Sequence, residues 1–261
     1  MVITSESEER TRGPALVAHR GYALRYPENT IESLTAAVEA GACFVELDVQ
    51  FTADGFPVLL HDADLERTAG VPERVMDLQL ARLQEIEVNE PARFGETFAG
   101  VHVPTLAEAM SFLGEWPRVK AFVEIKSESL QRFGREWVVE RVMSDLLPRL
   151  DQCALISFDM DALLMARERE AVSIGWVLDD LSPATREAAA AHSPEYLFCD
   201  YEMIPDHEKL WPGPWQWALY DVSDPRLALR LAARGAQLIE TMAIREMLEH
   251  PAFASGVCSD E

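Results

Sequence analysis

Short apolar runs alternate along the chain with segments of helical period. Apolar runs of this length, bounded by turn residues, are typical of buried strands. Several of the intervening segments begin with helix-start signals. Asn29–Glu32 and Thr105–Glu108 fit capping boxes, and Ser182-Pro183 and Asp224-Pro225 each place a cap residue before a proline. The predicted strands are Ala15–Ala18, Cys43–Val49, Val119–Ile125, Cys153–Ser157, Ser173–Leu178, Glu195–Cys199, Trp215–Leu219 and Ala236–Glu240.

Eight strand–helix units in a chain of 261 residues predict an α/β fold, a closed parallel (β/α)8 or TIM barrel. A doubly wound sheet is the alternative, but no Gly-rich dinucleotide loop follows the first strand and no GxxxxGK[ST] motif is present. The connection from Asp62 to Val119 is too long for a structureless loop. We therefore expect a small insertion subdomain at about residues 62–104 over the barrel mouth, with one short helix near Leu78–Ile86. Residues 1–14 are expected to form a flexible leader, 15–250 a single catalytic barrel domain and 251–261 a tail.

The charge balance narrows the range of partners. There are 23 Lys and Arg residues against 45 Asp and Glu residues, a net charge of −22, which repels nucleic acid and anionic membranes. An anionic small-molecule substrate would need a local positive site. No apolar run is long enough to cross a membrane, and the polar N-terminal segment has no signal-peptide core, so we expect a cytoplasmic protein without stable membrane association. The four cysteines form no CxxC pair, which favours reduced, buried thiols. Nothing in the sequence indicates the oligomeric state.

Acidic residues stand where a barrel interior normally carries valine or isoleucine. Side chains alternate along a strand, so Glu46 and Asp48 share one face while Val45, Leu47 and Val49 take the face toward the helices. Glu124 and Lys126 repeat the pattern on the next predicted strand. Buried carboxylates need a counter-charge, and oxygen-only ligands favour Mg²⁺, Ca²⁺ or Mn²⁺. The alternative is a structural ion-pair network with Lys126 or Arg20.

Two histidines are predicted at the same mouth. His19 and Arg20 follow the first strand, at the barrel face where active sites form. Asp54-Gly55 is a two-residue hairpin signal, which would place Asp48 opposite His61 and return His61 to the level of the carboxylates. Two histidines can serve as acid and base, and Arg20 with its planar donor fork can hold a phosphate. A phosphoester substrate follows from this combination.

The sequence resembles the glycerophosphodiester phosphodiesterase family, and the similarity spans nearly the whole chain from residue 15. The resembling segments are His19-Arg20-Gly21, Pro27-Glu28-Asn29-Thr30, Glu46-Leu47-Asp48-Val49, Asp54-Gly55 through Pro57-Val58 to His61-Asp62, Leu65-Glu66-Arg67-Thr68, Val103-Pro104-Thr105-Leu106 and Val123-Glu124-Ile125-Lys126, with weaker matches at Ser157-Phe158 and Gly235–Thr241.

The resemblance implies a TIM barrel that cleaves glycerophosphodiesters to glycerol phosphate and an alcohol. It implies one divalent cation held by Glu46, Asp48 and Glu124. It also implies that His19 and His61 act as general acid and base, and that Arg20 and Lys126 contact the phosphate. The neighbouring glycerol hydroxyl would be the nucleophile, through a cyclic phosphate, and such an intramolecular attacker is already positioned.

The sequence departs from the family pattern near its C-terminal end. The usual Trp-Thr-Val-Asn run reads Trp217-Ala218-Leu219-Tyr220, and the usual Thr-Asp after the last strand reads Glu240-Thr241. We expect Trp217, near a strand end, to wall the substrate pocket. Among the other candidates, Glu28 can point at the site, Asp62 can orient His61 or cap a turn, and the arginines of the insertion can touch a head group or lie in solvent. Two other functions remain open: a lysophospholipase D or phospholipase on the same barrel, and a phosphate-binding barrel without activity.

Overall fold

Eight parallel strands close into a barrel in the computed structural model, which describes residues 13–253. The order around the barrel is β1-β9-β8-β7-β6-β5-β4-β2, and pairing of β1 with β2 closes it. This confirms the predicted TIM barrel, and each predicted strand begins and ends within two residues of an observed one. The barrel strands are β1 (Ala15–Ala18), β2 (Phe44–Phe51), β4 (Lys120–Ile125), β5 (Cys153–Ser157), β6 (Ser173–Val177), β7 (Tyr196–Asp200), β8 (Gln216–Tyr220) and β9 (Leu238–Thr241), and β3 (Pro57–Leu59) lies outside the barrel.

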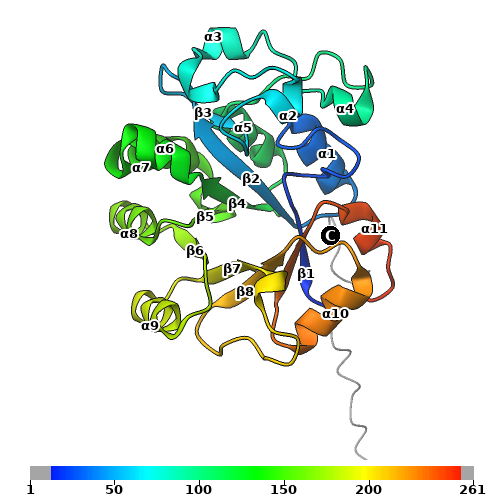
Figure 1. Cartoon of the computed structure of the whole chain (residues 1–261), viewed down its shortest axis with the longest axis vertical. Helices are drawn as coiled ribbons and strands as arrows, with labels where there is room; N and C mark the ends of the chain where they lie inside the picture. The colour runs from blue at the N-terminus through cyan, green and yellow to red at the C-terminus, as the bar shows by residue number, and fades with distance from the viewer. Residues whose placement is uncertain (1–12, 254–261) are drawn as a thin grey trace, which may run out of the picture.

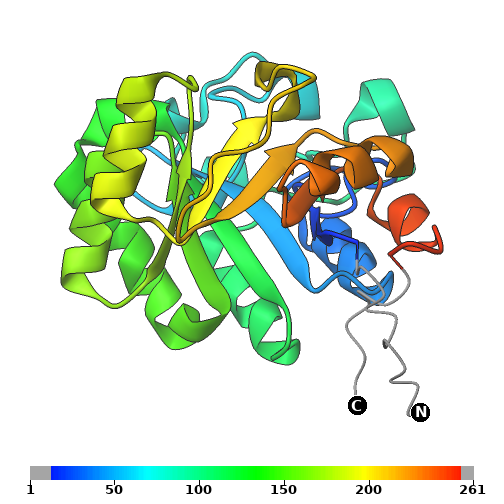
Figure 2. The ribbon, with the colours of Figure 1, turned by 90° about the horizontal axis from the view of Figure 1, so that it is seen from below.

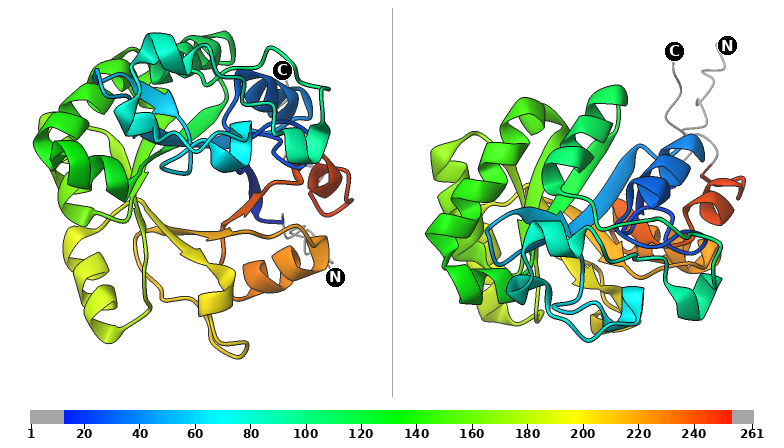
Figure 3. Two further views of the ribbon diagram at one scale, coloured as in Figure 1. Left: turned by 45° about the horizontal axis from the view of Figure 1, so that its top comes forward. Right: turned by 90° about the horizontal axis from the view of Figure 1, so that it is seen from above.

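Helices form a layer around the outside of the strands (Figure 2; Figure 3, left). The predicted caps at Thr105, Ser182 and Asp224 are confirmed, since each side chain accepts a backbone N–H of its own first turn. The first capping box lies one residue later than predicted, because Thr30 caps α1 and Ser33 completes the box. The helices of this layer are α1 (Ile31–Glu39), α5 (Leu106–Glu115), α6 (Ser127–Phe133), α7 (Arg135–Leu146), α8 (Met160–Arg169), α9 (Pro183–His192), α10 (Pro225–Ala233) and α11 (Ile244–Leu248), and short 3-10 turns cover Leu147–Gln152 and Tyr201–Met203.

The hairpin between β2 and β3 differs from the predicted one by one residue. Gln50 pairs with Val58 and Phe51 with Pro57, so Asp48 faces Leu60 rather than His61. The reason is the turn. The Thr52 N–H donates to the Phe56 carbonyl and the Phe56 N–H to the Thr52 hydroxyl, which encloses a three-residue loop instead of the expected Asp54-Gly55 pair.

The insertion has its own apolar cluster. It contains α2 (Glu66–Ala69), the 3-10 turn Val75–Asp77, α3 (Leu80–Leu83) and α4 (Pro91–Phe94), which Figure 1 shows together at one end of the molecule. The predicted helix near Leu78–Ile86 is present only as the short α3. Apolar side chains from the hairpin and the insertion bury one another there, namely Val58, Leu60, Leu65, Val75, Met76, Leu83, Ile86, Val88, Val101 and Val103.

Two further clusters divide the barrel into an outer and an inner core. Val45, Leu47 and Val49 are fully buried between the strands and the helices, as predicted. The inner cluster fills the barrel with Val17, Phe122, Ala154, Ile156, Val177, Phe198, Ala218 and Leu238. The barrel interior is therefore a packed core, and only its upper end, where the strands reach their carboxyl termini, is left for catalytic side chains.

Most of the predicted leader and tail, with Cys258, lies outside the described residues. Within residues 13–253, Cys153 and Cys199 are buried thiols that form no disulfide. No helix in that range has the length and apolar content needed to span a bilayer.

Candidate active site

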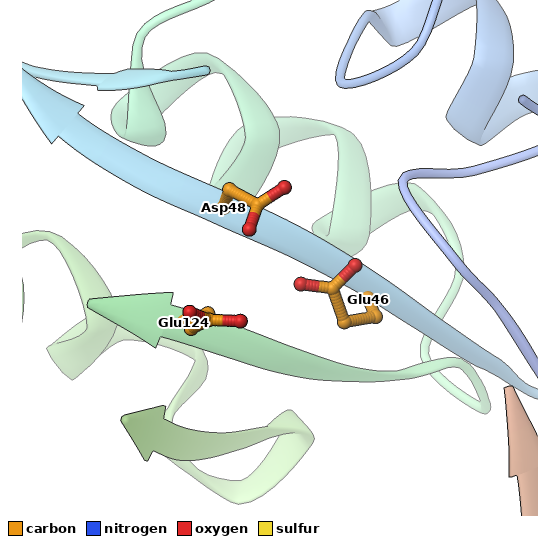
Figure 4. A group of neighbouring side chains, drawn as sticks. All are labelled: Glu46, Asp48 and Glu124. Atoms are coloured by element: carbon orange, nitrogen blue, oxygen red, sulfur yellow. The ribbon is translucent and has the colours of Figure 1, made fainter. Parts of the chain in front are cut away.

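Three carboxylates meet at the upper end of the barrel. Glu46 and Asp48 project from β2, and Glu124 is directed toward them from the neighbouring β4 (Figure 4). One oxygen from each lies within 4.8 Å of the others. Asp48 pairs in register with Glu124, which fixes their closeness through the sheet rather than through flexible side chains. The predicted carboxylate cluster is thus brought together by the barrel.

Two basic side chains lie on these carboxylates. Lys126 Nζ is 2.9 Å from Glu124 and 3.2 Å from Asp48, and Arg20 Nε is 3.1 Å from Asp48. Burial would raise the pKa of Asp48, but the charges of Lys126 and Arg20 outweigh it and lower the pKa. Burial and the charge of Asp48 raise the pKa of Glu46 well above its usual value. The three carboxylates of the cluster thus outnumber the two cations that contact them, and they oppose one another's ionisation.

The donor set fits a divalent cation. Glu46 Oε1 is buried and accepts no hydrogen bond, and the buried Asp48 Oδ1 meets only the Lys126 ammonium, as an ion pair. Unsatisfied carboxylate oxygens in a buried position are costly, and a hard cation with oxygen ligands would remove that cost. Lys126 lies 3.2 Å from Asp48 Oδ1, so the ion-pair network expected as the alternative is also present, but it leaves Glu46 Oε1 without a partner.

A tight turn after β1 aims His19 and Arg20 into the barrel mouth. Arg20 and Gly21 both have positive φ, and a Cβ on Gly21 would lie 2.5 Å from Ser33 Oγ, so only glycine fits the second position. The Arg20 N–H donates to Glu46 Oε2 at 3.1 Å. The turn thus brings this backbone against the carboxylate cluster.

His19 is held by residues from the last two strands. Its Nδ1 donates to Asp221, which directly follows β8. Its Nε2 lies 3.8 Å from Glu46. Burial would lower the pKa of His19, but the charge of the buried Glu240 and the hydrogen bond to Asp221 outweigh it and raise the pKa. Burial raises the pKa of Glu240 itself to about 7.

His61 has a similar arrangement. Its Nδ1 donates to Asp62 at 2.7 Å, and Asp62 is in turn bound by Arg67. In both histidines Nδ1 is engaged by a carboxylate, so Nε2 remains for proton exchange. Asp62 therefore orients the imidazole, one of the two roles expected for it.

The segment before α1 both caps the helix and reaches the site. Asn29 donates to Asp48 Oδ2 at 2.8 Å and accepts the Asp48 N–H at 3.1 Å. Glu28 is buried and pairs with Arg20 and with Arg67. The segment therefore caps α1 and also contacts Asp48 and Arg20.

One cavity of about 230 Å³ lies beside the cluster; Glu124 of the cluster lines it, whereas Glu46 and Asp48 do not. One side of it is charged and the other is apolar and aromatic. The lining residues are His19, Arg20, His61, Glu124, Lys126, Ile156, Phe158, Val177, Phe198, Tyr220, Asp221 and Glu240. The expectation that Trp217 walls the pocket is wrong. Trp217 is buried in the outer core, where its Nε1 donates to the Trp211 carbonyl and its ring meets Trp211 edge-on.

Sequence reasoning missed Asp221, Glu240 and Tyr220 as pocket residues. The alternation of the last predicted strand places Glu240 inward with Leu238, so the signal for Glu240 was available. Asp221 stands just beyond a predicted strand end, which is also a barrel-mouth position. The sequence does not show that Asp221 and Glu240 lie beside His19, because these residues are near opposite ends of the chain.

The fold and the pocket define a class: a (β/α)8 barrel whose mouth joins a carboxylate cluster to two carboxylate-supported histidines. A sequence profile of the glycerophosphoryl diester phosphodiesterase family matches residues 19–240, and the chain belongs to this family.

Relatives named for this activity show the same similarity. A glycerophosphodiester phosphodiesterase of Caldanaerobacter subterraneus is 40% identical over 115 residues, 43% of this chain and 45% of the relative. A probable glycerophosphodiester phosphodiesterase of Mycobacterium tuberculosis is 33% identical over 189 residues, 70% of this chain and 66% of the relative. The matches thus span less than two thirds of each of these relatives.

Solved structures share the fold. An Oleispira antarctica phosphodiesterase, determined with the product sn-glycerol-3-phosphate, superposes with a TM-score of 0.79 at 23% identity, covering 90% of this chain and 95% of that one. A protein from Silicibacter pomeroyi described as a putative glycerophosphoryl diester phosphodiesterase gives 0.80 at 20% identity, covering 95% of each chain.

Proposed function

We propose that this protein hydrolyses glycerophosphodiesters to glycerol phosphate and an alcohol. The observation that carries the proposal is the convergence of His19 and His61, each with a carboxylate on Nδ1, beside three carboxylates within 4.8 Å of one another. Membership of the family agrees with it. The names of the relatives supply the substrate class.

Each group has a role that follows from its chemistry. One histidine Nε2 accepts the proton of the attacking hydroxyl, and the other donates a proton to the departing alcohol. In the cyclic route that the resemblance implies, the attacker is the neighbouring glycerol hydroxyl, and water then opens the ring. Arg20 and Lys126 bind phosphate oxygens and supply the positive field that the net charge of −22 lacks.

Glu46, Asp48 and Glu124 would hold one divalent cation, Mg²⁺ or Ca²⁺, with Mn²⁺ a third candidate. When bound, the ion would stabilise negative charge on the phosphoryl oxygens. The cytoplasmic location and the absence of nucleic-acid and membrane partners stay predictions.

A lysophospholipase D would need an exposed apolar surface for an acyl chain, and the insertion was the expected place for it. The large apolar side chains that the described chain exposes are Leu24, Phe56, Trp137 and Leu147, all outside residues 62–104. The structure therefore gives no specific support to this alternative.

The test is release of glycerol phosphate from glycerophosphocholine with Mg²⁺ or Ca²⁺, and then with a chelator. We expect chelator-sensitive turnover, and a His19→Ala variant that stays folded but loses turnover by ~10²-fold or more. Turnover that survives chelation would contradict the metal role, and an unchanged His19→Ala rate would contradict the role of His19. No turnover on a panel of glycerophosphodiesters, with tight binding of glycerol phosphate, would favour the binding protein instead.

A further inference from the structure

Arg67, in α2 of the insertion, bridges two carboxylates from different parts of the chain. Its Nη1 and Nη2 donate to the two oxygens of Glu28 at 2.6 and 2.8 Å. Its Nε donates to Asp62 Oδ2 at 2.8 Å. A single planar guanidinium thus makes three charge-assisted hydrogen bonds, and Arg67 is not among the residues that line the pocket.

One of these two carboxylates, that of Asp62, supports His61. Asp62 uses one oxygen for Arg67 and the other for His61 Nδ1, at 2.7 Å. Both His61 and Asp62 are partly exposed, with side chains 33% and 29% accessible, so packing alone does not fix them. Arg67 holds Asp62 in the orientation that keeps the proton on Nδ1 and leaves Nε2 as the acceptor.

The other carboxylate, that of Glu28, supports Arg20. Glu28 accepts from Arg20 Nη1 at 3.1 Å while it is held by both Nη atoms of Arg67. Its side chain is only 4% exposed, so its negative charge depends on these two arginines. Without Glu28, the remaining carboxylate contact of Arg20 would draw its guanidinium onto Asp48, 3.1 Å from Nε.

We propose that Arg67 is a positioning residue through which the insertion sets the orientation of both His61 and Arg20. The proposal rests on the proposed function, in which His61 moves a proton and Arg20 binds phosphate. Arg67 touches neither substrate nor reacting atoms. It acts through Asp62 on the proton-transfer step and through Glu28 on phosphate binding.

Two variants and a control test the bridge. Arg67→Ala removes all three donors, and Arg67→Lys keeps the charge but supplies a point charge that cannot bridge both carboxylates in this geometry. The control is Arg82→Ala, which removes an exposed ion pair with Glu85 in the same insertion. With glycerophosphocholine, we expect kcat to fall about 10- to 100-fold in Arg67→Ala and by a smaller factor in Arg67→Lys, with Arg82→Ala like the parent.

Guanidinium rescue separates positioning from stability. Because Arg67 is 43% exposed, added guanidinium can enter the space left in Arg67→Ala. Tens of millimolar guanidinium chloride should raise the kcat of that variant and leave the parent unchanged, whereas sodium chloride at equal concentration should not. A folded Arg67→Ala with parental kcat and KM overturns the proposal. Loss of folding in both Arg67 variants overturns it too, because Arg67 would then be purely structural.

The two arms are separated by their partners. Asp62→Asn should lower kcat with little change in KM, and Glu28→Gln should mainly raise KM. In the Arg67→Ala background, Asp62→Asn should cost little more, since the bridge is already lost. Fully additive effects would show that the residues act independently and would overturn the bridge.

A spectroscopic measurement separates failure of this inference from failure of the proposed function. If the parent shows no turnover, the proposed function fails, but the ¹⁵N signals of the imidazoles still report the His61 tautomer. We expect the parent to carry the His61 proton on Nδ1 and Arg67→Ala to shift toward the Nε2 tautomer, with His61→Gln used to assign the signals. Identical His61 signals in parent and Arg67→Ala would overturn the positioning role, whatever the activity.

Discussion

Two layers of the barrel interior lie only two residues apart on the same strands. In the lower layer, Phe122 stacks on Phe44 at 6.0 Å and meets Phe198 edge-on at 5.0 Å. In the upper layer the same two strands, β2 and β4, present Glu46 and Glu124. The lower layer is apolar and closely packed, whereas the upper layer is crowded with carboxylates. The comparison shows that the barrel places its apolar core and its chemical groups at different levels along its axis, and that the carboxylates at the second level oppose one another's charge.

The largest expected effect comes from the lower layer. Phe122→Ala should lower the free energy of unfolding by about 3–5 kcal/mol, because it leaves a cavity among the rings of Phe44, Tyr196 and Phe198. Denaturant unfolding measures the change. The kcat per folded molecule should stay within a few-fold of the parent. A stable variant with lost turnover would break the comparison.

In the upper layer we expect the opposite result: a substitution there should lower turnover without lowering stability. Glu46→Gln should lower kcat/KM by about 100-fold or more, because a proposed metal ligand is lost. Burial and the charge of Asp48 raise the pKa of Glu46, so an ionised Glu46 destabilises the folded state. With the metal removed by a chelator, the neutral glutamine side chain avoids this cost, and the melting temperature of the variant should rise. Calorimetry in chelator, beside turnover with metal, gives both numbers. A lower melting temperature would mean that Glu46 stabilises the fold.

The smallest effect concerns Glu240, whose pKa is raised from 4.5 to about 7, by burial first of all. The folded state then binds this proton more tightly than the unfolded state, so the contribution of Glu240 to stability is lost as the pH rises from about 4.5 to about 7. Glu240→Gln removes that loss. In chelator, it should gain stability relative to the parent between pH 5 and pH 8. A constant difference across this range would contradict the shifted pKa.

Most of the fold and half of the site followed from local patterns. Strand alternation alone placed Glu46, Asp48, Glu124 and Lys126 inward, and the barrel then brought them together. The hairpin register failed because turn type depends on hydrogen bonds of Thr52 that a dipeptide signal does not contain. The prediction for Trp217 failed because it was based on a position near a strand end and not on the side to which the residue points. The alternation of β8 places it outward.

The contacts that complete the site were beyond local reasoning. His19 meets Asp221 across 202 positions, and Arg67 meets Glu28 across 39. Such pairs depend on how the strands are ordered around the barrel and how the insertion rests on it. No periodicity encodes them, so they became visible only in three dimensions.

The junction between the first and the last strand of the barrel gives these long contacts a consequence for the newly made chain. The His19 N–H donates to the Thr241 carbonyl across the junction of β1 and β9. On the ribosome, β1 emerges first and waits until almost the whole chain has been synthesised for β8 and β9 to arrive. Until then His19 Nδ1 has no Asp221 carboxylate to accept its hydrogen bond. A chain that ended before β8 would carry the proposed metal-binding carboxylates and the His61–Asp62 pair, but His19 would lack the carboxylate that orients it. The proposed pair of proton-transfer groups is therefore complete only with the final strands.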